Sequence, residues 1–185
     1  LRGTVTFLFQ PAEEGPPDGE EGGAALMVRE GALDDPPVGA VFGFHVWPED
    51  LGTVLFAPGN VTAAADTFVI TVKGKSAHAA RPHEGVDAVV IAAEVVTALQ
   101  TFVSRVSDPT DPAVLTVGTI HGGLRRNIIA DRVVLEGTVR TLSETNRRKV
   151  RQLMESVVKN VTEIYGADYQ YEYIEGNPSV FNNPE

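Results

Sequence analysis

The order of apolar segments after residue 60 constrains the fold more than any other feature of the sequence. Alternating apolar residues predict a strand at residues 67–73, and a long apolar stretch predicts a helix over residues 86–106. The later segments are strand patterns at 114–120 and 132–141, a helix pattern at 143–165 and a strand pattern at 168–174. The order β-α-β-β-α-β is that of the ferredoxin-like split βαβ unit, so we expect a two-layer domain of this kind.

The residues before position 60 follow a different pattern. Apolar runs at residues 5–9, 40–46 and 53–57 predict strands, and residues 24–30, closed by Gly31, predict a helix. This alternation is typical of an α/β layer. We therefore expect the chain to be divided near residue 60.

Charge and composition exclude some classes of partner. The net charge of −10 argues against nucleic acid, because phosphate binding requires clustered lysine and arginine. No apolar run approaches the roughly 20 residues that cross a bilayer, so we expect no membrane partner. The chain has no cysteine, which removes thiolate metal sites and fits a reducing compartment, so we expect a cytoplasmic protein.

The polar residues that could carry chemistry each have two interpretations. Glu13 and Glu14 follow the apolar run at residues 5–9, and they form either a solvated acidic loop or a site at a strand end. His45 ends another apolar run and is either a buried core histidine or a metal ligand. His78 lies in a segment with loop character, where histidines are usually solvated, and His121 is expected at the surface.

The motifs FQPAEE, GFHVWP, GKSAHAARPHEGVDA and GGLRRNIIADRVVLEGTVR occur in this order along the chain. In this respect the sequence resembles the metal-dependent amidohydrolases and peptidases that include hippurate hydrolase, aminoacylases and indole-acetyl-amino-acid hydrolases. The resemblance implies that residues 1–61 are the central part of a zinc-peptidase-like α/β catalytic domain. It also implies a lid and dimerisation domain at 62–175, and a return to the catalytic domain at 176–185, so we expect an internal fragment.

The resemblance implies hydrolysis of the amide bond of N-acyl amino acids or small peptides by a metal-activated water. Glu13 matches the general base, and Glu14 and His45 match ligands of two divalent ions, which are zinc or else manganese, cobalt or nickel. Chemistry supports this division, because a carboxylate bound to a metal has lost basicity and the proton acceptor must be a neighbouring free one. The other ligands would lie outside the chain, so we expect these residues alone to be inactive.

Three further residues match positions in the implied lid domain. His78 matches a histidine that reaches the neighbouring subunit's active site as an oxyanion donor, so the resemblance implies a homodimer through the lid. Asn127 matches a substrate-contacting asparagine, and Arg140 matches an arginine that binds the substrate carboxylate. Arg140 could equally be a structural ion-pair partner. The alternative for the whole chain is a non-catalytic dimerisation or small-molecule-binding module of ferredoxin-like fold.

Overall fold

The computed structural model describes residues 3–17 and 19–184. The chain is divided into two compact units, Leu1–Thr53 and Val54–Glu185. Most of the regular secondary structure lies in the second unit.

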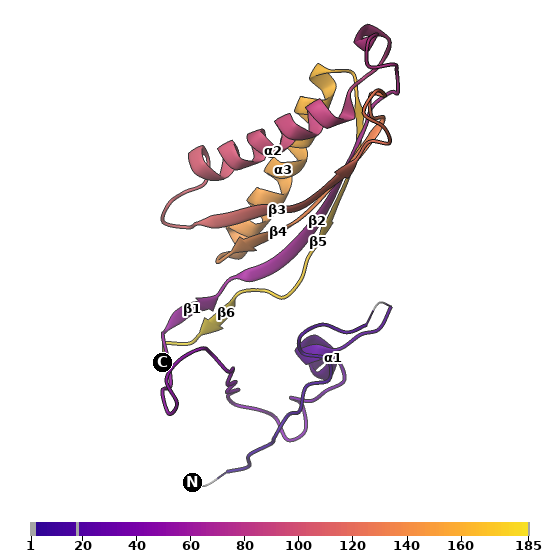
Figure 1. Cartoon of the computed structure of the whole chain (residues 1–185). Helices are drawn as coiled ribbons and strands as arrows, with labels where there is room; N and C mark the ends of the chain where they lie inside the picture. The colour runs from indigo at the N-terminus through magenta and orange to yellow at the C-terminus, as the bar shows by residue number, and fades with distance from the viewer. Residues whose placement is uncertain (1–2, 18, 185) are drawn as a thin grey trace. The chain divides into compact units, whose positions relative to one another are not determined.

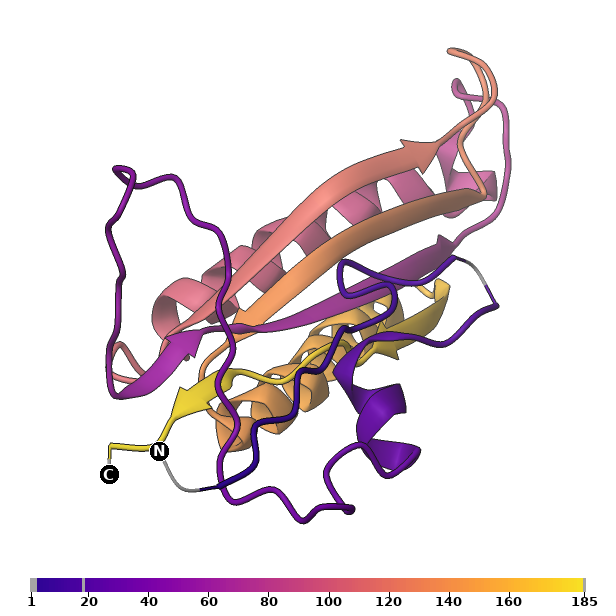
Figure 2. The same ribbon diagram turned by 90° about the horizontal axis from the view of Figure 1, so that it is seen from below.

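A four-stranded antiparallel sheet forms one layer of the second unit. Its strands are β2 (Ala64–Lys73), β3 (Ala113–Gly122), β4 (Arg132–Thr141) and β5 (Asp168–Ile174), in the order β3-β4-β2-β5. The helices α2 (Ala88–Arg105) and α3 (Glu144–Ile164) both cover the same face of this sheet (Figure 1; Figure 2). The expected βαββαβ order and its two layers are confirmed.

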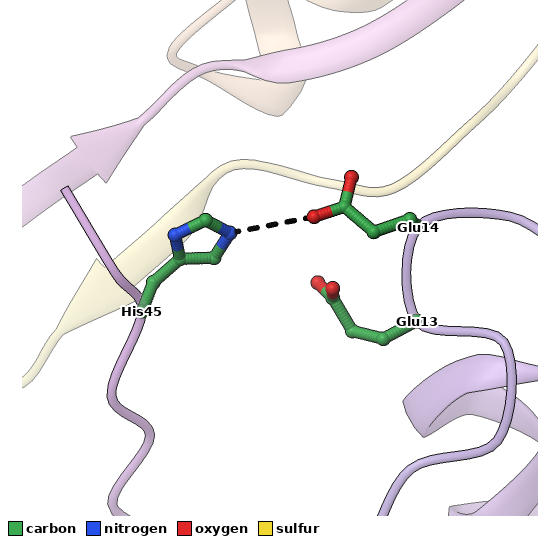
Figure 3. A group of neighbouring side chains, drawn as sticks. All are labelled: Glu13, Glu14 and His45. Carbon is green, nitrogen blue, oxygen red and sulfur yellow. Dashed lines mark ion pairs between the residues drawn. The ribbon is translucent and has the colours of Figure 1, made fainter. Parts of the chain in front are cut away.

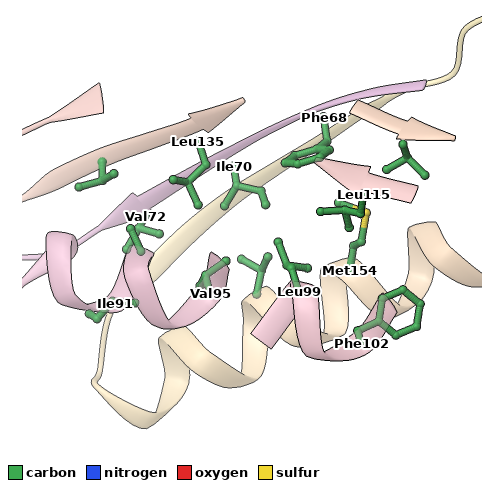
Figure 4. Packing of buried hydrophobic residues seen from close by; sticks show 14 of the residues in the cluster. Phe68, Ile70, Val72, Ile91, Val95, Leu99, Phe102, Leu115, Leu135 and Met154 are labelled. Atoms are coloured by element: carbon green, nitrogen blue, oxygen red, sulfur yellow. The ribbon is translucent and has the colours of Figure 1, made fainter. Parts of the chain in front are cut away.

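The core lies between the sheet and the two helices (Figure 4). Alternate residues of β2 and β4 point into it, because successive side chains of a strand point to opposite faces. The largest side chains of the core that are fully buried are Phe68, Ile70, Ile91, Leu99, Leu135 and Met154. Gly137 in β4 permits a close approach, since a Cβ there would lie 2.4 Å from the ring of Phe68.

Helix α2 is long and apolar enough, by length and composition alone, to cross a membrane, with a mean hydropathy of 1.4. Its position in the domain gives another reason for this composition. One face of α2 packs into the core through Ala88, Ile91, Ala92, Val95, Leu99 and Phe102.

The ends of the two long helices follow local signals in the sequence. The Oγ of Ser143 accepts a hydrogen bond from the backbone N–H of Asn146 at 3.0 Å, so Ser143 is the N-cap of α3. Gly166 follows this helix with φ of +66°, a conformation that favours glycine. The carboxylate of Asp87 caps α2 by accepting from the N–H groups of Val89 and Val90. The expected limits of both helices are confirmed within a few residues.

Two short strands pair where the chain enters and leaves the domain. These strands are β1 (Gly59–Thr62) and β6 (Val180–Asn182), which form a two-stranded antiparallel ribbon. The strand expected at residues 53–57 is absent from the structure, because the chain begins to pair only at Gly59.

In the first unit the structure has the helix that the sequence predicts but not the strands. The helix is found as α1 (Gly23–Arg29), and Gly31 follows it with φ of +87°. The strands expected at residues 5–9 and 40–46 are wrong for the described residues, which are extended without pairing. A strand requires a neighbour for its N–H and C=O groups, and the described part of residues 3–53 provides none. The aromatic side chains of these runs are consequently exposed, as in Phe9 at 85% and Phe44 at 89%.

Candidate metal centre and paired loops

Glu13, Glu14 and His45 lie together in the first unit, although 30 residues lie between Glu14 and the histidine in the sequence. One ligand atom from each side chain lies within 4.8 Å of the others. Figure 3 shows the imidazole directed toward the Glu14 carboxylate, with Nε2 of His45 and Oε1 of Glu14 separated by 3.8 Å. All three residues are exposed, so His45 is not the buried core histidine that was one interpretation of its sequence context.

A tight turn presents the two glutamates. Ala12, directly before Glu13, has φ of +49°, a left-handed conformation that residues other than glycine adopt at a cost. The turn is closed by a hydrogen bond from the N–H of Gly15 to the carbonyl oxygen of Ala12 at 3.1 Å. A Cβ at Gly22 would lie 2.9 Å from the Cβ of Ala12, so the glycine allows the start of α1 to pack against this turn.

The ring of His45 has a defined hydrogen-bonding arrangement. Its Nδ1 lies 2.6 Å from the carbonyl oxygen of Val46, which can only accept, so Nδ1 carries the proton. In the neutral ring, Nε2 is then an acceptor that faces the carboxylate of Glu14. Two acceptors that face each other, such as this nitrogen and the Glu14 carboxylate 3.8 Å away, are an arrangement that can bind a metal ion between them. Metal-binding histidines commonly donate their other ring N–H to a backbone carbonyl in this way.

The donor set fits a divalent metal ion. Imidazole nitrogen and carboxylate oxygen are ligands of zinc, manganese, cobalt and nickel. Ligand atoms around a tetrahedral zinc ion lie roughly 3–3.5 Å apart, so the exposed side chains need only small rotations to close on an ion. Among the residues that the structure describes, Glu13, Glu14 and His45 therefore form a group that could hold a metal ion.

A second group of candidate residues lies at one end of the sheet in the second unit. The loop after β2 and the loop after β3 run side by side there (Figure 1; Figure 2). His78 and Ile128 form an isolated antiparallel bridge, and the N–H of Ala79 donates to the carbonyl oxygen of Asn127 at 3.1 Å. This pairing brings together His78 and Asn127. Both residues are exposed.

Arg140 is separate from this pair. His78 and Asn127 lie beyond the Arg132 end of β4, and Arg140 lies at the other end of this strand. The rise of a strand puts roughly 25 Å between Arg132 and Arg140. The guanidinium of Arg140 donates to the carbonyl oxygen of Val139 at 3.2 Å. Among the described residues no carboxylate forms an ion pair with Arg140, so the interpretation as a structural ion-pair partner finds no support.

The other two histidines lie outside both groups. His83 is exposed in the short 3-10 helix η1 (Pro82–Glu84). His121 is exposed in β3 opposite Val134, as expected for a surface residue.

Comparison with protein families identifies the second unit. Residues 63–166 match the family model described as a peptidase dimerisation domain, which spans most of the βαββαβ fold. The chain belongs to this M20 peptidase dimerisation domain family.

Relatives with functional names match the chain over nearly its whole length. The N-acyl-L-amino acid amidohydrolase of Geobacillus stearothermophilus is 44% identical over 186 residues, which cover 100% of this chain and 49% of that protein. The N-acetyldiaminopimelate deacetylase of Bacillus subtilis is 46% identical over 158 residues, covering 85% of this chain and 41% of that protein. The chain thus spans about half the length of these relatives.

Solved structures give the same assignment. The YXEP protein of Bacillus subtilis, described as a dinuclear metal binding peptidase from the M20 family, is 30% identical. It superposes with a TM-score of 0.72 over 95% of this chain and 42% of its own. A crystal structure from methicillin resistant Staphylococcus aureus is 36% identical, with a TM-score of 0.87 over 95% of this chain and 45% of that chain.

Proposed function

We propose that this chain is part of a metal-dependent amidohydrolase that cleaves the amide bond of N-acyl amino acids. The observation that carries the proposal is the grouping of Glu13, Glu14 and His45, since one ligand atom from each lies within 4.8 Å of the others. The names of the similar amidohydrolase and deacetylase support the substrate class. Residues 1–61 would belong to the catalytic domain, 62–175 to the dimerisation domain, and 176–185 to the return.

The exposed aromatic side chains of the first unit support this assignment. Side chains such as Phe7 and Phe42, which are 78% and 85% exposed, normally lie in a core. In the proposed enzyme the remainder of the catalytic domain would pair with these extended segments and cover them.

In the proposed mechanism Glu14 and His45 would hold a divalent ion, which when bound polarises the amide carbonyl and lowers the pKa of water toward neutrality. Glu13 stays free of the ion and keeps its basicity. It accepts the proton of the attacking water and passes it to the leaving amine. His78 would donate a hydrogen bond to the oxyanion that develops on the carbonyl oxygen. Asn127 would contact the substrate. Arg140 lies at the other end of β4 from His78 and Asn127, so it would bind the carboxylate of the substrate in the other subunit's site, through two parallel N–H donors.

The partner in this proposal is a second copy of the chain, bound along α2 and β3. The flank of α2 beside β3 includes Gln100, whose side chain donates to the carbonyl oxygen of Leu115 in β3 at 3.2 Å. Helical periodicity places Val89, Val96 and Val103 on this flank. The opposite flank faces α3, since Glu94 accepts from the hydroxyl of Tyr165.

Charge distinguishes the two edges of the sheet. β3 forms one edge and its sequence, AVLTVGTIHG, has no lysine, arginine or carboxylate. β5 forms the other edge and includes Asp168 and Glu172. Charged edge strands resist pairing with another chain, and uncharged ones permit it. The uncharged edge of β3 and the adjoining flank of α2 therefore form the surface that we assign to the dimer.

The proposal is tested with the full-length protein, including any residues beyond this chain. Purified protein is assayed against N-acetyl and N-benzoyl amino acids before and after chelation, and again after Zn²⁺, Mn²⁺, Co²⁺ or Ni²⁺ is restored. We expect hydrolysis that is lost with the chelator and regained with one of these ions. A protein that binds no divalent ion and hydrolyses none of these amides would instead be a non-catalytic dimerisation module.

A further inference from the structure

The ring of His78 has the opposite hydrogen-bonding arrangement to that of His45. The backbone N–H of Ala80 lies 3.1 Å from Nδ1 of His78. A backbone N–H can only donate, so Nδ1 must be the unprotonated nitrogen. A neutral imidazole carries one proton, which therefore lies on Nε2. The outer nitrogen of His78 is then a hydrogen-bond donor, whereas Nε2 of His45 is an acceptor.

Backbone hydrogen bonds on both sides of His78 hold the loop in the conformation that places the N–H of Ala80 against the ring. The N–H of Ala79 donates to the carbonyl oxygen of Asn127, and the N–H of Ile129 donates to the carbonyl oxygen of Ala77 at 2.9 Å. The N–H of Arg81 donates to the carbonyl oxygen of His78 at 2.8 Å, which closes a turn over residues 78–81. The N–H groups of Ala79 and Arg81 thus each donate to a backbone carbonyl oxygen. The N–H of Ala80, which lies between them in the sequence, donates to the imidazole.

We infer that Ala80 is a positioning residue whose backbone N–H fixes His78 as the Nε2–H tautomer. The side chain of Ala80 takes no part, so the sequence carries no sign of this role. The inference rests on the proposed function in one respect, because an oxyanion accepts hydrogen bonds and requires His78 to offer a donor. The other neutral tautomer would present a lone pair to that oxyanion and would repel it.

The tautomer is measured directly by ¹⁵N NMR on the full-length protein with ring-labelled histidine. Spectra are recorded near pH 8.5, well above the ordinary histidine pKa of about 6.5. The signals of His78 are identified by their loss in His78→Gln. We expect an unprotonated, hydrogen-bonded Nδ1 and a protonated Nε2. A protonated Nδ1, or an even mixture of the two neutral forms, would overturn the inference.

The contribution of the Ala80 N–H is isolated by replacing this residue with its α-hydroxy acid analogue, lactic acid. The change turns the N–H into an oxygen and keeps the methyl group. We expect both tautomers of His78 to become populated and kcat/KM to fall roughly three- to tenfold, the range for one uncharged hydrogen bond.

The same replacement at Ala79 is the matched control. It removes the hydrogen bond from Ala79 to the carbonyl oxygen of Asn127, which has the same length of 3.1 Å as the bond from Ala80 to His78. It also makes the carbonyl oxygen of His78 a weaker acceptor, but the hydrogen bond from the N–H of Ala80 to Nδ1 of His78 remains. We expect the control to loosen the loop without changing the ring protonation of His78. Equal changes of the His78 signals in both variants would mean that loop order, rather than the Ala80 bond, selects the tautomer.

This experiment can contradict the inference about Ala80 without contradicting the proposed amidohydrolase function, and the reverse. A tautomer that depends on Ala80, combined with unchanged kcat/KM, would support the positioning inference and remove His78 from the proposed mechanism. Normal hydrolysis by a protein whose His78 has Nδ1 protonated would overturn the inference and leave the amidohydrolase activity standing.

Discussion

Asp66 and Arg147 form a two-pronged ion pair between β2 and α3. Nε of Arg147 donates to Oδ2 at 2.9 Å and Nη2 donates to Oδ1 at 2.5 Å, while the side chain of Asp66 is fully buried and that of Arg147 is 9% exposed. The hydroxyl of Tyr173 and the N–H of Gly176 also donate to this carboxylate. The pair therefore fixes the point at which the chain leaves the domain after β5.

These contacts determine the protonation of Asp66. Burial alone would raise the pKa of this carboxyl, but the hydrogen bonds from Arg147, Tyr173 and Gly176 outweigh burial and hold the pKa below its ordinary value. Burial and the hydrogen bond to Asp66 raise the pKa of the Tyr173 hydroxyl, which stays protonated and donates.

We expect Asp66→Asn to lower the free energy of unfolding by about 3 kcal/mol or more at pH 7, because it removes the buried carboxylate of the pair and leaves Arg147 only the exposed Glu144, 3.5 Å away, as an ion-pair partner among the described residues. A carboxyl with a lowered folded pKa stabilises the fold above its unfolded pKa of about 3.9, and this contribution is lost as pH falls through the folded pKa. The difference in the free energy of unfolding between wild type and Asp66→Asn should thus become smaller below about pH 4. Urea denaturation of the 185-residue chain at pH 7 and pH 3 measures both effects.

Glu163→Gln is the control for this measurement, since it removes one negative charge from an exposed position on α3. It should change the free energy of unfolding by less than about 0.5 kcal/mol. An Asp66→Asn chain as stable as Glu163→Gln at pH 7 would contradict the assignment of the pair as a stabilising contact.

The predicted division of roles between the two glutamates is tested with two variants of the full-length protein. Glu13→Gln keeps the size of the side chain but removes its basicity, so metal content should stay near wild type while kcat falls by about 10²-fold or more. Glu14→Ala removes a ligand, so bound metal should be lost together with activity. Metal analysis and kinetics on the same preparations measure both quantities. Near-normal turnover by Glu13→Gln would exclude Glu13 as the general base.

The sequence predicted the second unit well because its signals are local. The strand pattern at residues 132–141 and the helix pattern at 143–165 each depend on neighbouring residues, and the structure has both elements. The ion pair of Asp66 and Arg147 joins positions 81 residues apart, and neither residue has a local feature that marks the contact.

The first unit and the loops were harder to predict for physical reasons. Apolar alternation at residues 5–9 indicates a strand only where another strand can pair with it, and the described residues contain no such neighbour. The left-handed Ala12 and the N–H of Ala80 act through backbone geometry, which side-chain chemistry does not reveal. The resemblance of the sequence motifs implied a metal site with Glu13, Glu14 and His45, but the residue types alone left other interpretations open, and their proximity required the structure.

The dimer surface is tested by a matched pair of substitutions on α2. Val89 and Val90 are neighbours, and each is 50% exposed. Val89 lies on the flank beside β3, and Val90 points away from it. Val89→Glu places a charge in the proposed interface of both subunits, so the dimer dissociation constant should rise by about 10²-fold or more. Val90→Glu should leave it within about threefold of wild type.

Analytical ultracentrifugation of the full-length variants measures these dissociation constants. Both variants place a glutamate in the first turn of the same helix, so effects on helix stability should cancel. A dissociation constant that Val89→Glu leaves unchanged would show that the dimer does not use the flank beside β3, and equal weakening by both substitutions would show that the interface is not confined to this flank.

Mixed dimers test whether His78 acts on the active site of the partner subunit. His78→Ala and Glu13→Gln each inactivate the full-length protein in the proposed mechanism, the first by removing the oxyanion donor and the second by removing the base. If His78 acts in trans, one of the two sites in each mixed dimer combines an intact Glu13 with an intact His78. If it acts in cis, every site of a mixed dimer lacks one of the two groups.

Random exchange of equal amounts makes half of the dimers mixed, so trans action should restore about a quarter of wild-type activity. Subunit exchange is verified independently with two affinity tags, because failure to exchange would imitate cis action. Two differently tagged preparations of Glu13→Gln are the negative control, and they should stay inactive after mixing. Verified exchange without recovered activity would contradict trans action and would place any role of His78 within its own subunit.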